Sequence, residues 1–179
     1  MAGYAQAYLS DDAPTAADAI TVSPYLGYGS LTPALNLAEA NGRGVFVLAL
    51  TSNPEGAGVQ HAVNGDQAVA AGIVEGVTAS NAQASGEGRL GSIGLVIGAT
   101  VGGAVSDLGI DLQRANGPLL APGVGAQGAG PAELEAVFGT ARRQVLASTS
   151  RGVLKAGPSI DELRKAASVS AYEAATALR

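Results

Sequence analysis

Short apolar runs alternate with longer alanine-rich stretches along this chain, and this alternation limits its possible folds more than any other feature. The apolar runs show no regular spacing of polar residues, which is typical of strands buried on both faces of a parallel sheet. The predicted strands are Ala19–Ser23, Gly44–Thr51, Ile93–Thr100, Pro118–Pro122 and Gln144–Ser148. The predicted helices are Thr32–Ala40, Asp66–Ala84, Val101–Arg114, Pro131–Gly139 and a last one from about Ile160 to the end.

These repeated strand and helix units predict a single α/β domain over residues 1–179. With 179 residues, 47% of them hydrophobic, the chain can form one sizeable core but is short for two full domains. Five strands with intervening helices fit either an open doubly wound sheet or part of a (β/α)8 barrel. The residues that could bind a ligand or take part in a reaction follow the carboxyl ends of the predicted strands. A barrel has its active site there, so these positions favour the barrel.

The composition excludes several classes of function. The formal net charge is −5 and the ten Lys and Arg are scattered, so we expect no nucleic-acid partner. The absence of cysteine excludes disulfides, thiolate chemistry and cysteine-ligated metals. The longest uncharged apolar run, Ile93–Val105, is interrupted by glycines and shorter than the roughly 20 residues of a membrane helix. Without such a segment or a secretory signal, a cytoplasmic protein is expected.

The segment from Pro118 to Gly128 joins a short apolar strand to a glycine-rich turn that carries one amide, Gln127. Glycines permit positive φ and let backbone N–H groups approach an oxygen-rich ligand, while the Gln127 side chain can donate two hydrogen bonds. An anion site is one interpretation of this segment. A glycine-rich surface turn is the other.

Arg151 follows the last predicted strand and begins a short helix that runs to Lys155. A cation at a helix N-terminus opposes the helix dipole, and an anion bound by both the guanidinium and the free N–H groups would compensate. Arg151 and the Gly123–Gly128 turn would follow the last two strands of a barrel, where this fold binds phosphate. We therefore expect a phosphate site there, with a solvated surface cation as the alternative for Arg151.

Other polar residues give weaker signals. Ser52, Asn53, Pro54 and Glu55 follow the strand that ends at Thr51 and could bind a small polar ligand, although an ordinary Asn-Pro turn before a helix fits equally well. The single histidine, His61, lies in a polar stretch and is expected to be exposed. No spacing of residues indicates a metal site.

Several of these segments, in the same order along almost the whole chain, are similar to motifs of the orotidine 5′-phosphate decarboxylase family, especially its actinobacterial-type branch. The segment Pro122-Gly123-Val124-Gly125-Ala126-Gln127-Gly128 is the most specific of them. The other matching stretches are Ser23–Gly27, Leu50–Gly56, Val96–Thr100 and Ser150-Arg151.

The resemblance implies a (β/α)8 barrel that converts orotidine 5′-phosphate to uridine 5′-phosphate and carbon dioxide, in pyrimidine biosynthesis, without metal or organic cofactor. It implies that Ser52 contacts the pyrimidine ring, that Gln127 and Arg151 hold the phosphate, and that the glycines near Gln127 shape a closing loop. The expected substrate-binding set is Ser52, Asn53, Pro122, Gln127, Gly128 and Arg151. Full-length members are expected to be homodimers.

The family's catalytic residues have no counterpart in this sequence. Members carry a lysine on the second barrel strand and an Asp-x-Lys-x-x-Asp pattern on the third, and neither occurs here. The five strands therefore look like the fourth to eighth of the barrel, and we expect a truncated form with no catalytic residue and no decarboxylase activity alone. The alternatives are another phosphate-binding barrel enzyme, or a non-catalytic nucleotide-binding or assembly module.

Overall fold

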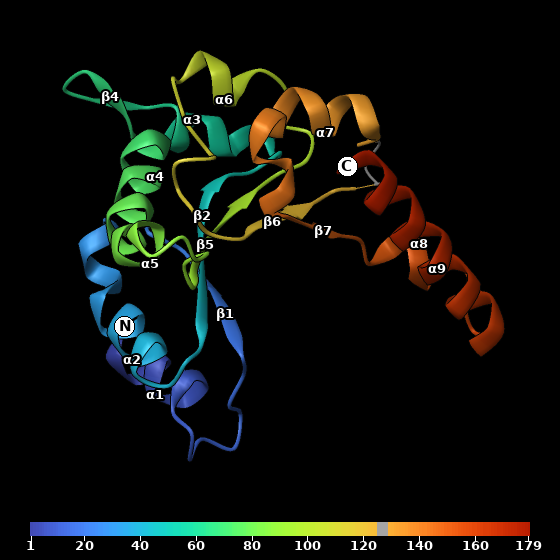
Figure 1. Ribbon diagram of the computed structural model, residues 1–179, viewed down its shortest axis with the longest axis horizontal. Coiled ribbons are helices and arrows are strands. Elements are labelled where there is room, and N and C mark those ends of the chain that lie inside the picture. Colours follow the sequence, from blue (N-terminus) through green and yellow to red (C-terminus); the bar gives the residue numbers. More distant parts are fainter. Residues whose placement is uncertain (125–128) are drawn as a thin grey trace.

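Five parallel strands form the central sheet (Figure 1). The structure is a computed structural model that describes residues 1–124 and 129–179. Its sheet consists of β1 (Ala19–Val22), β2 (Gly44–Leu50), β5 (Ile93–Ile97), β6 (Leu119–Pro122) and β7 (Val145–Ser148). The five predicted strands are thus confirmed, and their bounds differ from the predicted ones by a few residues at most.

The order of the strands distinguishes the two folds that the sequence left open. Neighbours in the sheet follow one another in the chain, β1-β2-β5-β6-β7, and every pair is parallel. A doubly wound sheet reverses its strand order at a switch point, whereas a barrel adds each new strand beside the previous one. The sheet is therefore part of a (β/α)8 barrel, as predicted.

Helices precede, connect and follow these strands. The α-helices are α1 (Ala2–Leu9), α2 (Thr32–Ala40), α3 (Ala57–Gln60), α4 (Val69–Ser80), α5 (Ala82–Gly86), α6 (Ala104–Asp107), α7 (Pro131–Phe138), α8 (Arg151–Leu154) and α9 (Ile160–Ala177). Short 3-10 segments are η1 (Tyr28–Leu31), η2 (Pro54–Gly56) and η3 (Gly139–Gln144), and β3 (Val63–Asn64) pairs with β4 (Gln67–Ala68) in a separate hairpin. The sequence prediction did not include α1 or this hairpin.

Two predicted helices were wrong in extent. The helix predicted at Val101–Arg114 is reduced to the four residues of α6, because Gly102 and Gly109 adopt φ of +59° and +63° and interrupt it on both sides. The helix predicted at Asp66–Ala84 begins only after β4 and is interrupted at Asn81. There the buried Asn81 side chain donates to the carbonyl oxygens of Ile93 (2.7 Å) and Ala115 (2.8 Å), which ties the end of α4 to the start of β5.

The core lies around the middle of the sheet. All five residues of β5 are buried. The neighbouring strands β2 and β6 each contribute further buried side chains. Helix α7 contributes Leu134, Val137 and Phe138 to the core. The largest fully buried side chains include Leu9, Leu31, Leu50, Leu95, Ile97 and Leu119.

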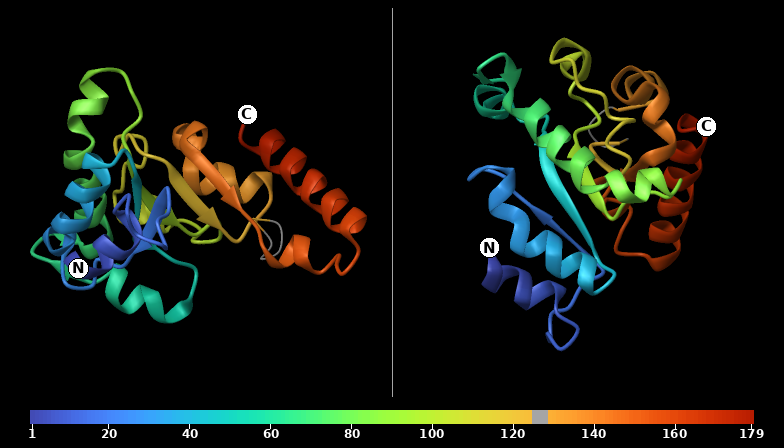
Figure 2. Two further views of the ribbon diagram at one scale, coloured as in Figure 1. Left: turned by 90° about the horizontal axis from the view of Figure 1, so that it is seen from below. Right: turned by 60° about the vertical axis from the view of Figure 1, so that its left-hand side comes forward.

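The two edge strands of the sheet have fewer pairing partners than the central strands. Among the described residues, β1 pairs only with β2 and β7 pairs only with β6. Beyond β7, helix α9 stands away from the sheet (Figures 1 and 2) and none of its residues is fully buried. Ser159 caps the start of α9, since its hydroxyl accepts a hydrogen bond from the N–H of Glu162 at 3.5 Å. The apolar side chains of α9 are at most half-buried, and Ile160 is 66% exposed.

Candidate functional site

The carboxyl ends of the strands are joined by backbone hydrogen bonds that bring the predicted site segments to one edge of the sheet. The N–H of Gly98, just after β5, donates to the carbonyl oxygen of Leu50 at 2.8 Å, and the N–H of Ala99 donates to that of Pro122 at 2.9 Å. Pro122 is in turn the register partner of Ser148 at the end of β7. The residues that follow β2, β6 and β7 therefore emerge side by side.

Ser52 and Asn53 follow β2 at this edge, and both are exposed. The carboxamide oxygen of Asn53 accepts a hydrogen bond from the Thr51 hydroxyl, and η2 and α3 begin directly after Asn53. Asn53 thus also has a structural role, as the residue that precedes a helical turn. No hydrogen bond occupies the Ser52 side chain among the described residues, so its hydroxyl is free to meet a ligand.

Arg151 lies at the same edge, as the first residue of α8. Its side chain is exposed and has no hydrogen bond or ion pair with the residues that the structure describes. The short helix predicted from Arg151 to Lys155 is confirmed as Arg151–Leu154. A guanidinium in this position can present its planar set of donors to a phosphate or carboxylate.

Pro122 ends β6 and is exposed at the start of the glycine-rich turn. The next residue, Gly123, has φ of +100°, a backbone conformation that the glycine makes accessible. Gln127 and Gly128, the other two predicted site residues, lie outside the described residues. The structure thus places Ser52, Asn53, Pro122 and Arg151 of the six.

A carboxylate stabilises the backbone just after this turn. Helix α7 begins at Pro131, and the Glu133 carboxylate accepts a hydrogen bond from the N–H of Gly130 at 2.9 Å. This backbone hydrogen bond holds the pKa of Glu133 below its usual range. The pattern is one half of a capping box, since Gly130 has no side chain to complete the other half.

A cluster of hydrogen-bonded polar side chains next to Ser52 was not predicted from the sequence. Gln60, at the end of α3, bonds to both the N–H and the hydroxyl of Thr51. The only sequence signal was a polar residue nine positions after the strand end, and no local spacing rule connects two such positions in a loop.

The strands themselves carry no ionisable side chain. The two lysines of the sequence, Lys155 and Lys165, both come after β7 and are exposed. His61 is exposed, as predicted. The described part of this edge can therefore bind an anion and a polar ring, but it offers no strand-borne group for proton transfer.

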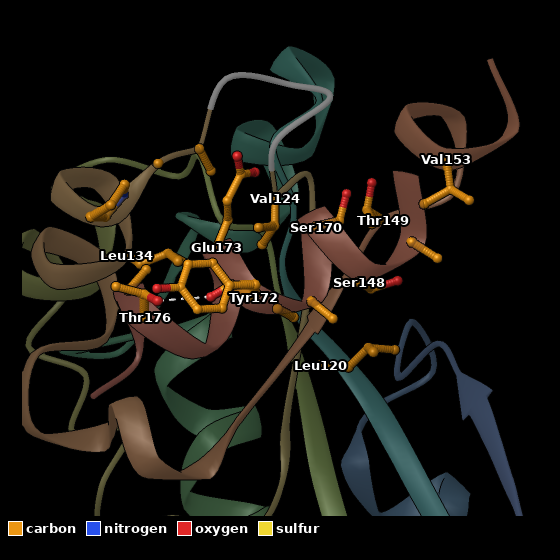
Figure 3. A pocket seen from close by; sticks show the side chains of 18 residues that line it. Leu120, Val124, Leu134, Ser148, Thr149, Val153, Ser170, Tyr172, Glu173 and Thr176 are labelled. Atoms are coloured by element: carbon orange, nitrogen blue, oxygen red, sulfur yellow. Dashed lines mark hydrogen bonds between the residues drawn. The ribbon is translucent and has the colours of Figure 1, made fainter. Parts of the chain in front are cut away.

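A cavity of about 850 Å³ opens between α9, α7 and the ends of β6 and β7 (Figure 3). Its walls are formed mainly by small and apolar residues, including Leu120, Leu134 and Val153. Ser52, Pro122 and Arg151 do not line it. None of its described lining residues carries a cation, although Ser148, Thr149 and Val153 place the cavity next to the segment that contains Arg151.

Within residues 1–124 and 129–179, none of the helices combines the length and apolar character that crossing a lipid bilayer requires.

Several solved structures that are similar to this chain are described as orotidine 5′-phosphate decarboxylases. A crystal structure described as such an enzyme from Streptomyces avermitilis matches 99% of this chain with a TM-score of 0.90 and 56% identity, and the match covers 60% of that chain. The orotidine monophosphate decarboxylase of Leishmania donovani matches 99% of this chain with a TM-score of 0.69 and 28% identity, over 63% of its own chain.

Curated relatives carry the same name. Orotidine 5′-phosphate decarboxylase of Streptomyces coelicolor is 57% identical over 180 residues, which cover 99% of this chain and 62% of the relative. That of Salinispora arenicola is 54% identical over 168 residues, which cover 93% of this chain and 58% of the relative. The chain thus spans about three fifths of the length of these relatives.

A family model described as "Orotidine 5′-phosphate decarboxylase / HUMPS family" matches residues 1–166. The match includes all five strands of the sheet and the residues after β2, β6 and β7 that make up the candidate site. The chain belongs to the orotidine 5′-phosphate decarboxylase / HUMPS family.

Proposed function

We propose that this chain supplies the phosphate-binding and base-binding part of an orotidine 5′-phosphate decarboxylase site. The observation that carries the proposal is the position of Arg151, an exposed cation at the first residue of α8, on the same sheet edge as Ser52. Names of relatives at 54 to 57% identity support the reaction of the whole protein, conversion of orotidine 5′-phosphate to uridine 5′-phosphate and carbon dioxide.

Each end of the nucleotide has a proposed partner. Arg151 would bind the phosphate monoester with charge-assisted hydrogen bonds, together with Gln127 and the backbone near Gly128, which enter by resemblance alone. Ser52 would bind the pyrimidine ring through its hydroxyl or N–H. Asn53 and Pro122 would shape the edge between them. Binding energy from the distant phosphate can drive loop closure and desolvation of the reacting ring, so these contacts serve the reaction as well as affinity.

The proton-transfer chemistry is proposed to lie elsewhere in the protein. The strands that the structure describes carry no ionisable side chain, and both lysines follow the last of these strands. A decarboxylation needs a proton for the carbon that loses its carboxylate, and a positioned acid must supply it. We therefore propose no turnover by residues 1–179 alone. A homodimer of the full-length protein stays a prediction from the resemblance, and a cytoplasmic location stays a prediction from the sequence.

Calorimetric titration with uridine 5′-phosphate and with uridine tests the proposal. We expect the phosphate-bearing ligand to bind more tightly, and Arg151→Ala to weaken its binding about 10- to 100-fold because a charged hydrogen-bond partner is lost. Arg143→Ala is the matched control, since Arg143 is an exposed cation just before β7, at the opposite end of that strand. Equal losses in both variants, or equal affinity for the two ligands, would contradict the phosphate site.

The same preparation can be supplied with orotidine 5′-phosphate to test for turnover. We expect the absorbance of the substrate to remain constant. Decarboxylation that co-purifies with the chain and disappears on Arg151→Ala would refute the assignment of proton transfer to residues outside it.

A further inference from the structure

Gln60 closes a small hydrogen-bonded cluster directly behind Ser52. Its carboxamide oxygen accepts from the N–H of Thr51 at 2.9 Å, and its carboxamide nitrogen donates to the Thr51 hydroxyl at 2.7 Å. The Thr51 hydroxyl then donates to the carboxamide oxygen of Asn53. One half-buried side chain therefore engages both polar groups of the residue that precedes Ser52.

Gly56 shows that this cluster is closely packed. A methyl group added to Gly56 would lie 2.8 Å from Oγ1 of Thr51 and 3.0 Å from Nε2 of Gln60. Carbon atoms do not approach polar atoms so closely without displacing them. The absence of a side chain at position 56 is what lets Gln60 reach Thr51.

The backbone of Ser52 also lies close to the end of the neighbouring strand, β5. A methyl group added to Gly98, just after β5, would lie 3.1 Å from the backbone nitrogen of Ser52 and 3.6 Å from its Cβ. The Ser52 backbone is thus held between the end of β5 and the cluster around Gln60. Its side chain has no hydrogen-bond partner among the described residues, so the backbone fixes the position of its Cβ and thereby the few rotamer positions that its hydroxyl can occupy.

We propose that Gln60 is a positioning residue for recognition of the nucleotide base. By fixing Thr51, it holds Ser52 in the orientation that presents its hydroxyl and N–H to the pyrimidine ring, while it makes no contact with the ligand itself. This inference rests on the proposed function, because it assumes that Ser52 meets the base. Side chains that are locked by a supporting shell hold a binding group within a fraction of an ångström of its working position.

The inference predicts a selective effect, because the phosphate site at Arg151 belongs to another strand. Gln60→Leu removes both hydrogen bonds with little change in size, and Gln60→Glu keeps the acceptor but loses the donor. Gly56→Ala keeps Gln60 and separates it from Thr51. Gln83→Leu is the control, since Gln83 is an exposed glutamine on α5 whose side chain, within the described part of the chain, pairs only with Glu87.

The test is calorimetric titration of the purified chain and these variants with uridine 5′-phosphate and with ribose 5-phosphate, which has the sugar and phosphate but no base. We expect Gln60→Leu and Gly56→Ala to weaken uridine 5′-phosphate about tenfold, Gln60→Glu to weaken it less, and ribose 5-phosphate to bind within twofold of the unsubstituted chain. Gln83→Leu should match the unsubstituted chain with both ligands.

Other outcomes overturn the inference in distinguishable ways. If both ligands weaken together in Gln60→Glu and Gly56→Ala, Gln60 acts on general stability and has no role in base recognition. If neither ligand weakens, Gln60 does not position Ser52. If the unsubstituted chain binds ribose 5-phosphate but shows no gain from the base, Ser52 does not meet the ring; if it binds neither ligand, the proposed function itself fails.

Discussion

At the scale of single residues, glycines determine which side chains can approach one another. Gly76 in α4 lies against the ring of Tyr28, and a methyl group added there would come within 2.6 Å of the ring carbons Cγ and Cδ1. The Tyr28 hydroxyl is meanwhile bonded to Ser80, one turn further along the same helix, at 2.7 Å. The ring is therefore fixed at both ends and cannot move aside easily.

Gly76→Ala should consequently destabilise the protein although alanine is the better helix former. We expect a loss of about 1–3 kcal/mol in the free energy of unfolding, because Tyr28 must leave its position. Gly72→Ala, one turn earlier, meets only the flexible end of Gln67 and should stabilise by roughly 0.5–1 kcal/mol. Denaturant unfolding of both variants checks the pair, and a change of the same sign in both would contradict the packing argument.

The positions of single residues could be predicted from the sequence where they follow a strand. Ser52 and Arg151 were selected because they follow strand ends, and the structure places both at the carboxyl edge of the sheet. Gln60 was not selected, because its contact with Thr51 depends on the path of a loop. That Ser52, Arg151, Gln127 and the other predicted site residues bind a ligand stays a prediction.

At the scale of elements, strands were easier to predict than helices. A buried parallel strand needs an apolar run, and each of the five runs became a strand. Helix extent depended on single residues that the alanine-rich pattern concealed, above all Gly102, Gly109 and Asn81. The hairpin of β3 and β4 did have a signal, since Asn64-Gly65 is a favoured turn pair and Gly65 adopts φ of +69°.

The start of α7 should respond to acid through Glu133. A carboxyl whose pKa is lowered on folding contributes stability above the pKa of its unfolded form, about 4.3 for glutamate, and loses it as the pH falls through the lower folded value. The protection factor for hydrogen exchange in the first turn of α7, which corrects for the slower intrinsic exchange in acid, should therefore fall across that acidic range. In Glu133→Gln the exchange should be faster already near neutral pH and lose this acid-dependent component. An unchanged pH profile in the variant would contradict the assignment.

At the scale of the whole molecule, the described sheet is a barrel segment with two edges. Strands β1 and β7 each have one neighbour among the described residues, and Leu146 in β7 is 51% exposed. Helix α9 adds further exposed apolar side chains, with Tyr172 at 74%. Open strand edges and uncovered apolar side chains recruit other chains. The order of the strands, which identified the barrel, was not readable from the sequence because any order satisfies the same apolar pattern.

Residues 1–179 alone should therefore self-associate. Sedimentation velocity should show a mass that increases with protein concentration, and Leu146→Lys should reduce it because a charge on an edge strand opposes pairing. Leu90→Lys is the control, since Leu90 is equally exposed, at 52%, but lies in a connector. A monomer at all concentrations with one sharp, cooperative unfolding transition would contradict this expectation.

The most direct measurement of the central claim is a crystal structure of the chain with uridine 5′-phosphate. We predict that the phosphate lies at the carboxyl edge of the sheet within hydrogen-bonding distance of Arg151 and Gln127, with the base toward Ser52. A ligand bound in the cavity under α9, or a phosphate at the strand edge with Arg151 directed elsewhere, would contradict the account.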